Sequence, residues 1–92
     1  GGQVWYSENN EASFELAKII QSTTQELLQN ENDRTVKRSG STIYLLRKLE
    51  CPAVLVECGF LSSPEEAALL ADENYRQQLA LVLCMGILRS IA

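Results

Sequence analysis

Glu57 stands directly after a run of four apolar residues, Ala53–Val56, and is followed by Cys58 and Gly59. A carboxylate at the end of a buried strand costs free energy unless it is paired, hydrogen-bonded or protonated. In open α/β sheets, ligand sites lie at the carboxyl ends of strands, and glycine allows a close approach of backbone to ligand. Glu57 is therefore our candidate functional residue, and a single carboxylate does not by itself name a reaction. The alternative is that Glu57 marks the exit of the strand into solvent, or pairs with a basic residue such as Arg47.

The other residues with reactive side chains are three cysteines, Cys51, Cys58 and Cys84, at spacings of 7 and 26 that match no CxxC or zinc-ribbon pattern. We expect three reduced and partly buried thiols. The chain contains no histidine, so by itself it cannot form a His-containing zinc site, a Ser-His-Asp triad or a Cys-His pair. A thiol enzyme using Cys58 would depend on nearby arginine or lysine for its thiolate.

Composition limits the class of protein. The chain has 92 residues, 12 acidic and 8 basic side chains, a net charge of −4 and a hydrophobic share of 46%. These values fit one globular domain or part of one, and the acidic balance argues against a general nucleic-acid binder. No apolar run approaches the ~20 residues that span a bilayer, so we expect no membrane insertion. The start, Gly1-Gly2-Gln3, shows no signal-peptide pattern.

The first half of the chain predicts strand, helix, loop and strand. Gln3–Ser7 is rich in strand formers. The segment from Glu11 to Gln29 has helical periodicity, and its apolar face is made by Leu16, Ala17, Ile20, Thr24, Leu27 and Leu28, with Gln21 outside that face. Residues Asn30–Gly40 are polar and predict a loop, and Thr42–Leu46 predicts a second strand.

The second half predicts one strand and two helices. Ala53–Val56 lacks alternation, which is typical of a strand covered on both faces in a parallel sheet. Ser63 can cap a short helix, with Glu66 completing a capping box, and Asp72 can cap a last helix to Ser90. The inner face of that last helix would carry Tyr75, Leu79, Val82, Leu83, Gly86 and Ile87. The fold class predicted is α/β, part of an open twisted sheet with flanking helices, in the order β-α-β-β-α-α.

The segment Pro52–Glu66, PAVLVECGFLSSPEE, resembles the PAVLVE-x-GFLSN-x-xE motif of zinc-dependent N-acetylmuramoyl-L-alanine amidases of the amidase-3 type, which are bacterial cell-wall hydrolases. The resemblance is closest to the sporulation-associated, CwlD-like members and covers nearly all 92 residues. Further matches to family segments are Ser13 with Leu16-Ala17, Arg34–Lys37, Tyr44–Arg47, and Tyr75 with Ala80, Gly86 and Ile87.

The resemblance implies that residues 1–92 are the C-terminal portion of an amidase-3 catalytic domain, a single and incomplete domain. In the family, two histidines and a glutamate of the first half hold zinc, and none of these positions exists here. We therefore expect zinc in the parent protein, meaning the whole protein of which this chain would be part, and none bound by this chain alone. Glu57 matches the family's general base. Arg47 and Arg34 are candidates for the substrate groove, the alternative being a solvated basic loop.

The function that the resemblance implies for the parent protein is hydrolysis of the amide bond between N-acetylmuramic acid and L-alanine in peptidoglycan, outside the cytoplasm. We expect the 92 residues alone to be inactive. Half of a sheet leaves an edge uncovered, so we also expect a homodimer or a strand-swapped assembly. The alternative function is a non-catalytic α/β interaction domain that retains the amidase scaffold.

Overall fold

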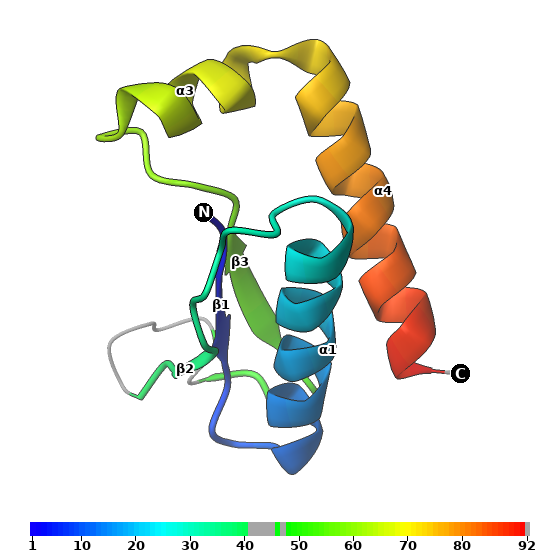
Figure 1. The fold of residues 1–92 in the computed structure, drawn as a ribbon. Helices are drawn as coiled ribbons and strands as arrows, with labels where there is room; N and C mark the ends of the chain where they lie inside the picture. The colour runs from blue at the N-terminus through cyan, green and yellow to red at the C-terminus, as the bar shows by residue number, and fades with distance from the viewer. Residues whose placement is uncertain (41–45, 47, 92) are drawn as a thin grey trace.

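The computed structural model describes residues 1–40, 46 and 48–91. Within these ranges the chain forms three strands and three helices (Figure 1). The strands are β1 (Gln3–Tyr6), β2 (Lys37–Arg38) and β3 (Val54–Glu57), and the helices are α1 (Glu11–Leu27), α3 (Pro64–Ala71) and α4 (Glu73–Ser90). The predicted α/β class and the order β-α-β-β-α-α are confirmed.

The three strands form one sheet in the order β2-β1-β3, with β1 parallel to β2 and antiparallel to β3. The expectation that β3 is covered on both faces of a parallel sheet is wrong. Leu55, in the middle of β3, is 41% exposed, because α1 covers only the opposite face of the sheet. The apolar run therefore does not mark a strand enclosed by the described part of this chain.

The second strand lies at a different place from the one predicted. Residues 42–45 of the predicted strand Thr42–Leu46 lie outside the described residues, and Leu46 itself is helical. β2 instead lies inside the predicted loop Asn30–Gly40. Both of its residues are exposed and charged, so no alternation of apolar and polar side chains predicts this strand. Its backbone pairs with β1, and the Ser39 N–H continues the ladder to the Tyr6 carbonyl at 3.0 Å.

Helix α1 covers the face of the sheet that carries Val4 and Val56 (Figure 1). The helix begins where Asn10 accepts a hydrogen bond from the Ala12 N–H at 2.9 Å, which is a standard N-cap. Val4, Ala17 and Ile20 form the buried core cluster. Gln21 is also buried, contrary to its predicted place outside the inner face, because its side-chain amide donates to the Gly2 carbonyl and accepts from the Val4 N–H at the start of β1.

Helix α4 packs against α1, and Gly86 faces Ile20 at the contact. Leu79, Val82 and Gly86 are buried as predicted. Ile87 is 50% exposed, because one residue turns a helix by about 100° and Gly86 already faces α1. Leu27, predicted for the inner face of α1, is 41% exposed on the last turn of that helix.

The predicted caps of the last two helices are present, with one difference. Asp72 accepts from the Asn74 N–H at 2.8 Å and so begins α4. Ser63 accepts from the Glu66 N–H at 3.4 Å and begins α3. The Glu66 carboxylate does not return to Ser63 to complete a capping box, since it accepts from the Phe60 N–H and the Gly1 amino group instead. Among the described helices, none has the length and hydropathy required to cross a bilayer.

Candidate active site

Glu57 ends β3 on the face of the sheet opposite α1. The antiparallel register pairs it with Gln3 and pairs Leu55 with Trp5, and residues two apart on a strand share a face. Gln3, Trp5, Leu55 and Glu57 therefore share one face, while Val4 and Val56 point to the core on the other. Glu57 is half-buried, so part of its surface is exposed.

The Glu57 carboxylate is held by Trp5. The indole Nε1–H donates a hydrogen bond to Oε1 of Glu57, and among the described residues Oε2 accepts none. The sheet brings the two side chains together diagonally across the β1–β3 pair. The periodicity of each strand alone cannot reveal this contact, because it depends on the register between two strands about 50 residues apart in sequence.

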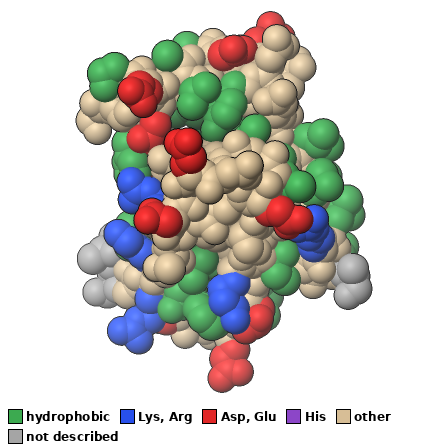
Figure 2. All heavy atoms as spheres, in the orientation of Figure 1, with side chains coloured by type: hydrophobic (Ala, Val, Ile, Leu, Met, Phe, Trp, Pro, Cys, Tyr) green, Lys and Arg blue, Asp and Glu red, His purple; other side chains and the backbone are tan. Residues whose placement is uncertain are grey.

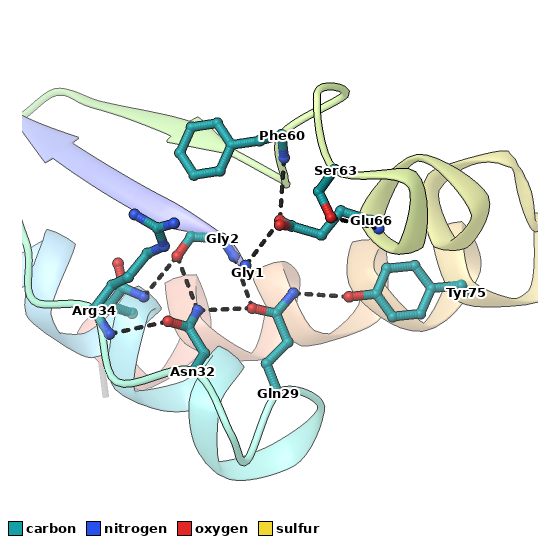
Figure 3. Close-up of polar contacts among 10 residues, drawn as sticks. Gly1, Gly2, Gln29, Asn32, Arg34, Phe60, Ser63, Glu66 and Tyr75 are labelled. Atoms are coloured by element: carbon teal, nitrogen blue, oxygen red, sulfur yellow. Dashed lines mark hydrogen bonds and ion pairs between the residues drawn. The ribbon is translucent and has the colours of Figure 1, made fainter.

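The start of β1 is fixed by three side-chain amides that converge on Gly2 (Figure 3). Gln29 accepts from the Gly2 N–H at 2.9 Å, while Asn32 and Gln21 donate to its carbonyl at 2.9 and 3.1 Å. A Cβ added at Gly2 would stand 3.3 Å from the Glu57 carbonyl oxygen, so the two strands approach closely here. These contacts set the position of β1, and through its ladder the position of β3.

Gln29 also connects this cluster to α4, since its amide donates to the Tyr75 hydroxyl at 2.8 Å (Figure 3). Sequence reasoning missed the role of Gln29 and Asn32, which fall in or beside a polar segment with no periodic pattern. Trp5 was also missed as a site residue. Only its residue type pointed to a role for Trp5, because an aromatic side chain with an N–H donor is suited to a site that is partly exposed to solvent.

Arg34 lies close to the residues that follow β3, and it does not form an ion pair with Glu57 among the described contacts. Its guanidinium lies 4.5 Å from the centre of the Phe60 ring, a cation–π arrangement. The other predicted groove residue, Arg47, lies outside the described residues. The structure therefore places Arg34 beside the strand end and leaves its role in substrate binding a prediction.

Glu66 contacts the backbone that follows β3. Hydrogen bonds from the Gly1 amino group and from the Phe60 N–H, in that order of effect, hold the pKa of Glu66 below its ordinary value. Glu66 lines a cleft of about 480 Å³ between α3 and the loop after α1, which Glu57 does not line. Glu66 thus supports the backbone after β3 and is not placed beside Glu57.

The three cysteines are free thiols. Cys51 and Cys84 are exposed, contrary to the expected partial burial, whereas Cys58 is half-buried. Burial raises the pKa of the Cys58 thiol, which lowers the fraction of thiolate at neutral pH. This shift opposes the thiol-enzyme alternative, which requires a thiolate at Cys58.

We expect Cys58 to be alkylated more slowly than Cys51 and Cys84 at neutral pH, because it has less thiolate and less access. Iodoacetamide labelling of the native protein, followed residue by residue by mass spectrometry, measures the three rates. Labelling of the unfolded protein is the control and removes the difference. Fastest labelling at Cys58 in the native protein would contradict this reading.

The side chains of the residues that the structure describes do not fit a zinc site. Zinc in proteins is commonly held by four ligands drawn from Cys, His, Asp and Glu. The chain has no histidine, and in residues 1–40, 46 and 48–91 no group of three or more cysteine or acidic side chains is placed to hold a metal ion.

Comparison with known proteins identifies the family to which this chain belongs. The family model described as N-acetylmuramoyl-L-alanine amidase matches residues 1–89. The chain belongs to this amidase family.

The relatives carry amidase names. The chain is 35% identical over 89 residues to the germination-specific N-acetylmuramoyl-L-alanine amidase of Bacillus subtilis, covering 97% of this chain and 37% of that protein. It is 32% identical over 85 residues to the probable cell wall amidase LytH of Staphylococcus aureus, covering 90% of this chain and 26% of that protein. The chain thus spans much less than half the length of these two relatives.

A solved structure shares the fold. The CwlD amidase from Clostridioides difficile, determined in complex with the GerS lipoprotein, matches with a TM-score of 0.93 and 38% identity. The match covers 99% of this chain and 46% of that chain. The predicted resemblance to CwlD-like amidases is therefore confirmed.

Proposed function

We propose that the parent protein hydrolyses the amide bond between N-acetylmuramic acid and L-alanine in peptidoglycan, with Glu57 as its general base. The observation that carries the proposal is the family match over residues 1–89, which includes the half-buried Glu57 at the end of β3. The alternative of a non-catalytic interaction domain is not favoured, because the relatives bear the names of amidases.

Glu57 can perform two proton transfers in this reaction. Its carboxylate accepts a proton from the water that attacks the amide carbon, and the resulting acid donates that proton to the nitrogen of the leaving L-alanine. General acid–base catalysis of this kind contributes roughly 10²–10⁴-fold to a rate. A half-buried carboxylate with one oxygen held and the other open has the geometry for such a transfer.

We further propose that residues 1–92 are the C-terminal portion of a larger catalytic domain. The share of the relatives that the chain covers, 37% and 46%, supports this proposal. Zinc, if it serves the parent protein as the resemblance implies, would have to be held by residues outside this chain. Because peptidoglycan lies outside the cytoplasmic membrane, we place the site of action of the parent protein there.

The experiment compares the 92-residue chain with the parent protein on purified peptidoglycan, each with added zinc. We expect peptide release by the parent protein and none by the 92 residues. Release by the 92-residue chain that disappears in Glu57→Ala would overturn the proposal that the chain is an incomplete catalytic domain. Absence of release by the parent protein would overturn the proposed activity.

We propose that the 92 residues by themselves form a homodimer or a strand-swapped assembly. Within the described residues β3 has a neighbour on one side only. Leu81, Leu88 and Ile91 are 62%, 57% and 75% exposed along α4, and Figure 2 shows hydrophobic side chains gathered on the side of the molecule where α4 lies. Light scattering over a range of concentrations should give the mass of at least two chains. A single-chain mass at the highest concentration would contradict the proposal.

A further inference from the structure

We propose that Trp5 is a positioning residue for Glu57, whose indole N–H fixes one carboxylate oxygen and leaves the other free for proton transfer. This inference rests on the proposed role of Glu57 as general base. It concerns a residue to which neither the family match nor the motif at Pro52–Glu66 assigns a role.

The sheet register brings Trp5 and Glu57 together. Trp5 pairs with Leu55, and Gln3 pairs with Glu57, so Trp5 and Glu57 are diagonal neighbours on one face. Diagonal neighbours lie roughly 7–8 Å apart, within reach of an aromatic side chain. The hydrogen bond from Nε1–H to Oε1 of Glu57 spans this diagonal. The contact is thus built into the strand pairing, and a flexible loop plays no part in it.

The indole ring of Trp5 is itself held by a neighbouring cation. Lys37 pairs with Trp5 across the β1–β2 ladder, and its Nζ lies 5.3 Å from the centre of the ring. A cation over the face of an indole attracts the ring. Lys37, Trp5 and Glu57 therefore form a row across the three strands, with a cation at one end and a carboxylate at the other.

The hydrogen bond from Trp5 also limits the torsional freedom of Glu57. The last torsion of a glutamate side chain is broad, so a carboxylate without a partner samples many orientations. A bond from a fixed N–H donor to Oε1 restricts that rotation. Among the described residues nothing donates to Oε2, so this oxygen is available to a reacting water. Small errors in the position of a catalytic group can cost about 10²-fold in rate.

The test is Trp5→Phe in the parent protein, which keeps an aromatic ring on β1 and removes the N–H donor. We expect kcat to fall on the order of 10- to 100-fold with KM nearly unchanged. Tyr6→Phe is the matched control, because Tyr6 is the next aromatic residue on β1 and points to the opposite face, toward α1. Its kcat should stay close to that of the unchanged protein.

A spectroscopic measurement keeps the proposal testable where Trp5→Phe fails to fold. The indole N–H resonance of Trp5 is identified in ¹H–¹⁵N spectra by its loss in Trp5→Phe or, failing that, by selective labelling and sequential assignment. We expect it to move upfield in Glu57→Gln, since a neutral amide accepts a weaker hydrogen bond than a carboxylate. An unmoved resonance would overturn the proposal.

The outcomes separate the positioning role from the proposed function. Loss of activity in Glu57→Gln with full kcat in a folded Trp5→Phe variant overturns the role of Trp5 and leaves Glu57 as the base. Full activity in Glu57→Gln overturns the proposed function itself. Loss of kcat in both variants, with the expected shift of the indole resonance, supports both.

Discussion

Replacing Glu57 with glutamine lowers the kcat of the parent protein for the muramoyl–L-alanine bond by roughly 10²–10⁴-fold, the usual contribution of a general acid–base group. Glutamine has nearly the shape of glutamate and can still accept a hydrogen bond from Trp5, but it cannot take a proton from water. The substrate contacts are retained, so we expect KM to change little. Steady-state kinetics of peptide release from purified peptidoglycan measure both parameters.

Glu65→Gln is the matched control for this prediction. Glu65 is exposed on the first turn of α3 and has the same chemistry as Glu57 without its place on the sheet. The control variant should retain the full rate. If Glu57→Gln is as active as Glu65→Gln while both proteins are folded, Glu57 is not the base and its half-buried position has a structural cause.

Replacing Gly86 with valine lowers the free energy of unfolding by about 1–3 kcal/mol, the usual cost of overpacking a well-filled contact. A Cβ at this position would lie 3.2 Å from Cα and 3.3 Å from Cγ1 of Ile20. The nearer atom belongs to the backbone of α1, so α1 and α4 must move apart to relieve the contact. Glycine and valine differ little in helix propensity, which leaves packing as the main effect.

Thermal unfolding followed by circular dichroism measures this change, since 1 kcal/mol lowers the Tm of a domain of this size by about 4–8 °C. Ala80→Val is the control, because Ala80 is exposed on the same helix and the new side chain meets solvent. We expect a smaller decrease there, up to about 0.7 kcal/mol, because valine has a lower helix propensity than alanine. Equal decreases in the two variants would show that the close approach of α1 and α4 is not what Gly86 permits.

The helices could be predicted from the sequence because their signals are local. Asn10, Ser63 and Asp72 cap the helices that follow them, and each cap is read from a single polar residue before a periodic segment. The buried positions Ala17 and Ile20 follow from the same periodicity. These features need no knowledge of the rest of the fold.

The sheet was harder to predict because its pairing is non-local. β2 consists of two exposed basic residues, so only the backbone of β1 specifies it. The apolar run of β3 indicated burial on both faces, yet Leu55 is 41% exposed within the described residues. A run of apolar residues reflects the burial of a strand in the whole protein. Part of that burial can come from surfaces that this chain does not supply.

The candidate site likewise contains residues that local sequence could predict and residues that depend on non-local pairing. Glu57 could be singled out from one strand, since a carboxylate after an apolar run is costly to bury. Trp5 could not, because its contact with Glu57 requires the register of β1 against β3. Gln29 and Asn32 could not be predicted either, since their side-chain amides form hydrogen bonds with the Gly2 backbone only in the folded chain.

The central claim is that Glu57 serves as the base in hydrolysis of one particular amide bond. Mass spectrometry of the products released from peptidoglycan by the parent protein tests it most directly. The account predicts peptides that begin with a free L-alanine amine, together with glycan strands that keep intact N-acetylmuramic acid, and their loss in Glu57→Gln. Products cut between sugars or within the stem peptide, or an unchanged yield from Glu57→Gln, would contradict it.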